Sequence, residues 1–142
     1  PLSVSLRRLL NDQFPNRFIH PQDSSIQGLS HVLWTGASID PKATARNAVF
    51  YGDKAIDRSP CGTGTSARMA QWHAKGLLKE GEKFIHESYI GSQFIGEIVG
   101  TGSLGEFSAI VPSIQGWAKV YGHNTISIDD KDDPYAYGFQ VI

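Results

Sequence analysis

The sequence predicts an α+β fold, and three features of its pattern predict that class. Two segments carry apolar residues or strong helix formers in helical patterns, one near the N-terminus and one over residues 63–75. Several short apolar stretches around them are typical of antiparallel strands. Fifteen glycines in 142 residues favour tight turns and short strands over long helices. We therefore expect a sheet with one central helix and one N-terminal helix.

Residues 1–14 are predicted to form the N-terminal helix. Pro1 and Ser3 are typical of a helix start. Apolar residues then recur at mostly helical spacing, namely at Val4, Leu6, Leu9, Leu10 and Phe14. Pro15 ends this helix, and the polar stretch 14–27 is expected to be a loop.

Three strands are expected before the central helix, over residues 29–35, 45–51 and 54–56. In the first of them, Val32, Leu33 and Trp34 are apolar in succession, which predicts that both faces are covered. Residues 36–43 form a turn around Pro41, and Gly52-Asp53 ends the second strand.

The central helix is predicted over residues 63–75, because it is rich in alanine and is followed by Gly76. Four strands are expected after it, over 84–88, 93–99, 107–112 and 117–128. A flexible hairpin connection over 100–106 joins the second and third of these, and residues 135–142 add a last short strand.

Composition limits the classes of partner. The net charge is -1 and no basic run is present, so nucleic acid and anionic membranes are not expected to bind. No apolar run approaches the roughly 20 residues of a membrane span, and no signal-peptide pattern is found. A single cysteine cannot form an internal disulfide, so a reducing, cytoplasmic location is expected. The acidic stretch 129–134 lacks the glycine and distal glutamate of a calcium loop, and no metal site is predicted.

Residues 57–67, Asp-Arg-Ser-Pro-Cys-Gly-Thr-Gly-Thr-Ser-Ala, contain the only cysteine. Pro60 stops the preceding segment and the Gly/Thr run can open a helix, so Cys61 is expected at a helix N-terminus. Backbone N–H groups and the helix dipole favour negative charge there, and such a position can activate a thiol. A lone cysteine is often a small buried apolar residue, but these surroundings favour a reactive one.

Two chemistries that use glycine-rich loops do not fit this segment. Residues 62–67 match the G-x-G-x-x-A string of a dinucleotide loop, but that loop should follow a strand directly. Here Pro60 intervenes, and proline cannot continue a central strand. A cysteine phosphatase loop has five residues between its cysteine and its arginine. Arg68 comes one position too late, which rotates it by about 100° on a helix.

Proton transfer at a carbon next to a carboxylate suits the segment better. The N–H groups of Gly62 and Thr63 could hold the carboxylate and stabilise the charge that develops as the proton leaves. Asp57 could accept hydrogen bonds from a substrate ammonium group. Cys61 would then act as the acid or the base.

The same eleven residues resemble the second active-site motif of the proline racemase family, which includes 4-hydroxyproline 2-epimerases and trans-3-hydroxyproline dehydratases. Further matching stretches are Ala74-Lys75-Gly76, Gly81-Glu82, His86-Glu87-Ser88, Ile90-Gly91-Ser92, Gly116-Trp117-Ala118, Tyr121-Gly122-His123-Asn124-Thr125 and Asp133-Pro134. The resemblance implies a diaminopimelate-epimerase-like half, with a mixed or antiparallel sheet wrapped around a central helix. It also implies that residues 1–142 are the C-terminal one of two pseudo-symmetric halves, in keeping with a first residue that is not Met.

The resemblance also implies roles for individual residues. In the family, two cysteines face each other across the α-carbon of the substrate, and Cys61 matches the second of them. Asp57 matches the residue that receives the substrate amine, and Gly62 and Thr63 match the carboxylate-binding pair. His31 resembles a histidine that lines the substrate site. Tyr51 falls where relatives often carry an aromatic wall, although a core position on the strand explains it equally well.

A cysteine at position 61 favours epimerisation, because the related dehydratases replace it, commonly by threonine. The implied activity is cofactor-independent epimerisation of 4-hydroxyproline, with proline racemisation as the alternative. The first family motif, with its Met-Cys-Gly-His-like sequence, is absent. We therefore expect the chain alone to be inactive and to need the N-terminal half as its partner, with a homodimer left open. A non-catalytic imino-acid-binding domain is the alternative of a different class.

Overall fold

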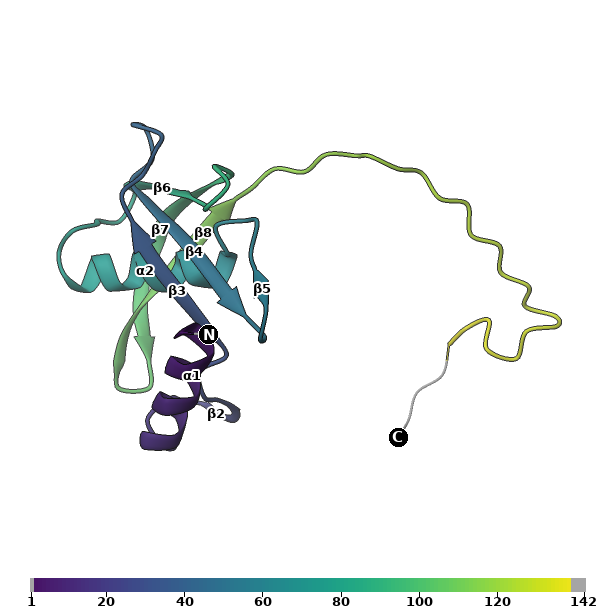
Figure 1. Cartoon of the computed structure of the whole chain (residues 1–142), viewed down its shortest axis with the longest axis horizontal. Coiled ribbons are helices and arrows are strands. Elements are labelled where there is room, and N and C mark those ends of the chain that lie inside the picture. Colours follow the sequence, from purple (N-terminus) through teal and green to yellow (C-terminus); the bar gives the residue numbers. More distant parts are fainter. Residues whose placement is uncertain (1, 139–142) are drawn as a thin grey trace.

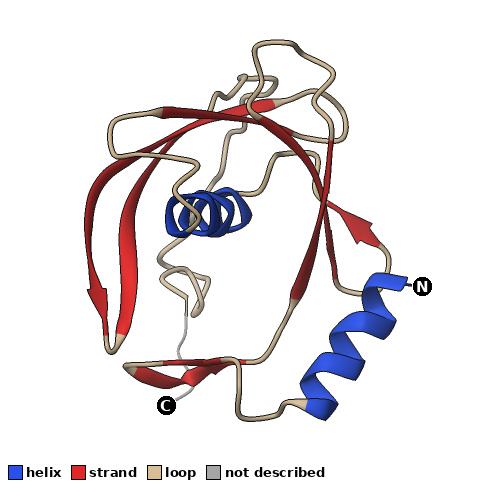
Figure 2. Ribbon diagram, turned by 90° about the vertical axis from the view of Figure 1, so that its left-hand side faces the viewer, coloured by secondary structure: helices blue, strands red, loops and turns tan. Residues whose placement is uncertain are grey.

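The computed structural model describes residues 2–138, and within them a six-stranded mixed sheet curves around one helix (Figures 1 and 2). Its strands are β3 (His31–Gly36), β4 (Ala45–Tyr51), β5 (Ala55–Ile56), β6 (Lys83–Glu87), β7 (Gln93–Leu104) and β8 (Phe107–Gln115). The order is β3-β4-β6-β7-β8, with β5 beside β4. Neighbours are antiparallel except β4 and β6, which are parallel.

Helix α2 (Gly62–Ala74) lies inside the curve of the sheet and is seen end-on in Figure 2. Its Met69 is fully buried and packs with Phe84 of β6 and Ile98 of β7 in the hydrophobic core. The rings of Trp72 and Phe84 are nearly perpendicular, with 5.2 Å between their centroids. Helix α1 (Leu2–Gln13) packs outside the sheet, against β3. The α+β class and the central helix are therefore as predicted.

Gly96 on β7 allows α2 to approach the sheet closely. A Cβ atom there would lie 2.6 Å from the sulfur of Met69 and 3.4 Å from the backbone oxygen of Phe84. We expect Gly96→Ala to lower the free energy of unfolding by about 2 kcal/mol, because the buried methionine has little room to move.

Gly102, on the same strand, is the matched control, because a Cβ atom at this position would have no neighbouring atom within 4 Å. Gly102→Ala should leave the free energy of unfolding within about 0.5 kcal/mol of the parent. Urea denaturation of the two variants checks this, and equal midpoints would contradict it.

Most boundaries lie within two residues of their predictions, as for the strand over 45–51 and both helices; Pro1 falls outside the described residues. The predicted loop over 14–27 is partly wrong, because it contains a small antiparallel pair, β1 (Ile19–His20) and β2 (Asp23–Gln27). Nearly all side chains of this pair are exposed, so no apolar alternation marks it in the sequence.

The predicted hairpin connection over 100–106 is also wrong, since β7 continues to Leu104 and the turn is only Gly105-Glu106. The strand β8 runs three residues further than predicted, through Pro112. Proline is tolerated there because β8 is the edge of the sheet, where one row of N–H groups needs no partner. At the other edge, β3 is not covered on both faces as predicted: His31, Trp34 and Thr35 are exposed.

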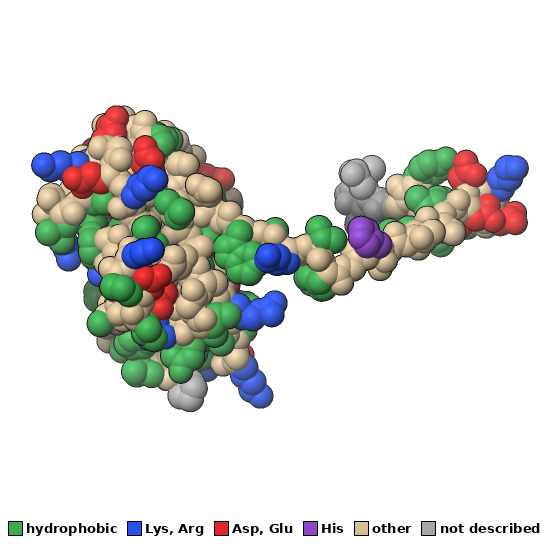
Figure 3. Space-filling view, turned by 90° about the horizontal axis from the view of Figure 1, so that it is seen from above, with side chains coloured by type: hydrophobic (Ala, Val, Ile, Leu, Met, Phe, Trp, Pro, Cys, Tyr) green, Lys and Arg blue, Asp and Glu red, His purple; other side chains and the backbone are tan. Residues whose placement is uncertain are grey.

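The strand predicted over 117–128 is absent. These residues form an extended arm that leaves the sheet after β8 (Figures 1 and 3). Their side chains are exposed, including Tyr121 at 99%. Residues 135–138 form turns instead of the predicted last strand, whose remainder lies outside the described residues. Neither described helix is long and apolar enough to cross a membrane.

Candidate functional site

Cys61 is the N-cap residue of α2, as the sequence predicted to within one residue. Its sulfur accepts a hydrogen bond from the N–H of Gly64 at 3.3 Å and lies 3.4 Å from the hydroxyl of Thr63. Among the described residues, the N–H groups of Gly62 and Thr63 donate no hydrogen bond. Unpaired N–H groups at a helix start attract anions, so the thiol lies beside two ready donors.

The backbone of Cys61 has a φ of 64°, and it is the one described non-glycine residue with positive φ. This conformation costs an L-residue on the order of 1–3 kcal/mol and persists only where neighbouring contacts hold it. On its amino side, the Cys61 N–H donates to the hydroxyl of Ser59 at 3.0 Å. On its carboxyl side, its carbonyl accepts the first hydrogen bond of α2, from Thr65 at 2.9 Å.

The carboxylate of Asp57 holds the loop that precedes Cys61 by accepting hydrogen bonds from Ser59. Its Oδ1 accepts hydrogen bonds from both the N–H and the hydroxyl of Ser59, each at 2.9 Å. Because that same hydroxyl receives the Cys61 N–H, Asp57 is connected to the thiol residue through Ser59. The second oxygen of the carboxylate, Oδ2, accepts no hydrogen bond within residues 2–138.

A cavity of about 620 Å³ lies between β3 and the first turns of α2. Cys61, Thr63 and Arg68 line it from the helix side, and His31 and Leu33 line it from the strand. Gly64 keeps it open, since a Cβ atom there would lie 2.8 Å from Leu33 Cδ1 and 3.3 Å from the sulfur.

The structure thus brings three of the five predicted site residues, Cys61, Thr63 and His31, to one cavity. Asp57 and Gly62 do not line it in this chain. Tyr51 is not a core residue: 41% of it is exposed, and its ring lies 5.8 Å from that of His31, centroid to centroid.

A buried polar cluster under the loop was not predicted from the sequence. Asn47 of β4, Thr65 of α2 and His86 of β6 are each at most 3% exposed. Asn47 Nδ2 donates to the carbonyl of Pro60 at 2.7 Å, and Thr65 Oγ1 lies 2.9 Å from Nδ1 of His86. Burial, together with the charge of Arg68, lowers the pKa of His86 to about 4, so this imidazole is neutral at pH 7.

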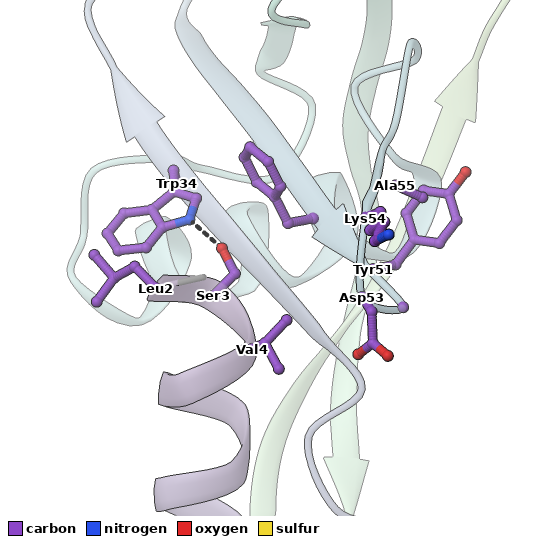
Figure 4. A pocket seen from close by; sticks show the side chains of 10 residues that line it. Leu2, Ser3, Val4, Trp34, Tyr51, Asp53, Lys54 and Ala55 are labelled. Atoms are coloured by element: carbon purple, nitrogen blue, oxygen red, sulfur yellow. Dashed lines mark hydrogen bonds between the residues drawn. The ribbon is translucent and has the colours of Figure 1, made fainter.

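A second cavity, of about 460 Å³, lies on the opposite face of β3 (Figure 4). The alternation of a strand places Trp34 on this face and Leu33 on the other. Leu2, Ser3 and Val4 from the first turn of α1 line it, and the indole N–H of Trp34 donates to the Ser3 hydroxyl at 2.9 Å. The lining is mostly apolar and contains no thiol.

The cavity beside Cys61 can support proton transfer next to an anion. It is lined by the thiol of Cys61, by Thr63 with its unpaired N–H group at the helix start, and by the imidazole of His31. Within residues 2–138, no three His, Cys, Asp or Glu side chains are grouped so that they could hold a metal ion.

Comparison with known proteins adds a family to this geometry. The family model described as proline racemase matches residues 1–140. An uncharacterized protein of Vibrio parahaemolyticus is 69% identical over 123 residues, which cover 87% of this chain and 37% of that protein. A 4-hydroxyproline 2-epimerase of Spirosoma linguale is 60% identical over 96% of this chain and 40% of its own length.

Among solved structures, a hydroxyproline epimerase from Agrobacterium vitis with bound trans-4-hydroxy-L-proline superposes with a TM-score of 0.78. It is 33% identical, and the match covers 99% of this chain and 39% of that one. The chain therefore spans about two fifths of the length of the relatives it matches.

Proposed function

The chain belongs to the proline racemase family, and we propose that it is the C-terminal half of an isomerase that epimerises 4-hydroxyproline at its α-carbon. Relatives named 4-hydroxyproline 2-epimerase, 58% and 60% identical over nearly the whole chain, support this substrate over proline. The observation that carries the proposal is the thiol of Cys61, which caps α2 beside the two unpaired N–H groups.

In the proposed reaction, the Cys61 thiolate removes the α-proton from one face of the substrate and becomes a thiol. The electron pair of the broken C–H bond moves into the carboxylate, where the N–H groups of Gly62 and Thr63 stabilise the added charge. A thiol on the opposite face then donates a proton to the α-carbon and becomes a thiolate. The configuration is inverted, and no cofactor is consumed.

Asp57 and His31 have binding roles in this proposal. The unoccupied oxygen of Asp57 accepts a hydrogen bond from the substrate ammonium group. His31 forms the wall opposite α2, with its ring against Tyr51. Because Asp57 does not line the cavity of this chain alone, the proposal requires that the N-terminal half completes the site around it.

The second thiol must come from elsewhere, because Cys61 is the only cysteine of the chain. We propose that the N-terminal half supplies it and that the arm over 117–128 packs against that half. The arm has no partner within the described residues, yet it carries large exposed apolar side chains, at Trp117, Val120, Tyr121, Ile126 and Ile128. Such surface is expected to be buried in a complete protein.

Incubation of the complete enzyme with trans-4-hydroxy-L-proline in deuterated water tests the proposal. We expect inversion at the α-carbon with deuterium incorporation, and slower reaction with L-proline. The 142-residue chain alone should leave the optical rotation of hydroxyproline unchanged. Faster reaction with proline would favour a racemase, and binding of either imino acid without any exchange would favour a non-catalytic binding domain.

A further inference from the structure

The peptide between Pro60 and Cys61 is held on both sides. Its carbonyl oxygen accepts from Asn47 Nδ2 at 2.7 Å and from the hydroxyl of Thr65 at 3.2 Å. Its N–H donates to Ser59 Oγ at 3.0 Å. These contacts orient the peptide before Cys61, and the Thr65 N–H, which donates to the Cys61 carbonyl at 2.9 Å, orients the peptide after it. Together they keep the residue in its left-handed conformation.

One proton assignment satisfies every donor of the buried cluster. Thr65 gives its hydroxyl proton to Pro60, so its oxygen accepts from Nδ1–H of His86 at 2.9 Å. Asn47 Nδ2 lies 3.0 Å from both ring nitrogens of His86, and in this assignment only Nε2 has a free lone pair to accept from it. The two protons of that amide nitrogen therefore go to Pro60 and to His86.

The cluster keeps this arrangement although it leaves one buried atom unsatisfied. Asn47 Oδ1 has no hydrogen-bond partner among the described residues. Rotating the amide by half a turn would not help, because Oδ1 would then face the carbonyl of Pro60, which is also an acceptor. That carbonyl would also lose the hydrogen bond from Nδ2. An unsatisfied buried acceptor is uncommon in folded proteins.

We propose that Asn47, Thr65 and His86 are positioning residues for the reaction of Cys61. Asn47 and Thr65 hold the carbonyl of Pro60, and His86 holds these two side chains in place. Through the Pro60–Cys61 peptide they orient the thiol toward the Gly64 N–H and the cavity. The proposal rests on the proposed function only in taking Cys61 as the reactive group.

The test is alkylation of Cys61 by iodoacetamide in the complete protein, measured from about pH 6 to pH 10, a range that spans the usual thiol pKa. Thr65→Val removes the hydroxyl at nearly constant volume, and Thr65→Ser keeps it. We expect Thr65→Val to slow alkylation at about pH 7.5 roughly tenfold, because a displaced sulfur loses its hydrogen bond from the Gly64 N–H. Thr65→Ser should restore the parent profile.

Ile98→Val is the matched control for a loss of stability, since Ile98 is a fully buried core residue that is not part of the cluster. Its alkylation profile should be that of the parent. Asn47→Leu, which has no donor for the Pro60 carbonyl, should behave like Thr65→Val. If Thr65→Val does not fold, Thr65→Ala replaces it, with folding checked by circular dichroism.

The proposal is overturned if the variants that lack a donor alkylate within about twofold of the parent, or if Ile98→Val is slowed as much as they are. Failure of the proposed function looks different. In that case the complete enzyme would not exchange the α-proton of hydroxyproline, while the alkylation profile would still depend on Thr65 and Asn47.

Discussion

Replacing the sulfur of Cys61 by oxygen should stop epimerisation by the complete enzyme. We expect Cys61→Ser to lower the rate about a thousandfold or more in both directions, because a serine hydroxyl holds its proton far more tightly than a thiol does. One of the two isomers of hydroxyproline should still exchange its α-proton with solvent. This is the isomer whose α-proton faces the thiol of the N-terminal half. Polarimetry and NMR in deuterated water measure the two effects separately.

Ser66→Ala is the control for this variant. Ser66 lies in the same first turn of α2, but its hydroxyl donates to the carbonyl of Gly62 and does not contact the sulfur. Its loss should change the rate by only about twofold. Epimerisation by Cys61→Ser at more than about a tenth of the parent rate would remove Cys61 from the chemistry that we propose for it.

The parts of the fold that the sequence predicted well are those specified by neighbouring residues. Helix α2 begins where Pro60 and the Gly/Thr run predict a start, and it ends before Gly76. The strand β4 has the predicted bounds. The position of Cys61 as the cap of α2 follows from the same local signals, so the sequence alone predicted where the candidate reactive thiol lies.

The errors lie where a segment depends on partners distant in the chain. The arm over 117–128 has residues suited to a strand, but the described residues provide no neighbouring strand for it, and a strand cannot form without one. The small pair of β1 and β2 is almost fully exposed, so it lacks the apolar alternation by which strands are found. The roles of the five site residues, and the place of the chain as one half of the enzyme, stay predictions.

The buried cluster could not be predicted, because its members come together only through the sheet. Asn47 and His86 are 39 positions apart and meet because β4 and β6 pair in parallel. In the sequence His86 belongs to a stretch that resembles the family, and nothing beside it marks a buried imidazole. Asn47 alternates with the apolar Ala45 and Val49 on the buried face of β4, which is the one local sign of a polar contact in the core.

The neutral imidazole of His86 should make the stability of the chain depend on pH in mildly acidic solution. Its pKa is about 4 in the folded chain and about 6.5 when solvated, since burial and the charge of Arg68 both disfavour protonation. Between these values the unfolded chain binds the extra proton. The free energy of unfolding should therefore fall as the pH drops from about 6.5 to 4, by about 3 kcal/mol in all.

Urea denaturation at several pH values between about 7 and 4 measures this dependence. Asp23 and Asp40 also titrate in acid, but hydrogen bonds lower their pKa values, so the stability they give is lost only as the pH falls below 3.8. The window from 6.5 to about 4 thus reports mainly on the histidine. His86→Gln should be less stable at about pH 7, because it breaks the contacts with Thr65 and Asn47, and nearly constant in stability across that window.

His31→Gln is the matched control, because it removes an exposed histidine and leaves the buried cluster intact. Its free energy of unfolding should depend on pH as steeply as that of the parent. If His86→Gln kept the pH dependence of the parent while His31→Gln lost it, the acid sensitivity would come from His31 on the cavity wall and not from the buried cluster.

Protonation of His86 should also affect the loop that carries Cys61. Because a protonated Nε2 would face the amide protons of Asn47, acid should weaken the hydrogen bond from Asn47 to the Pro60 carbonyl. Cys61 should therefore become misaligned before the whole chain unfolds.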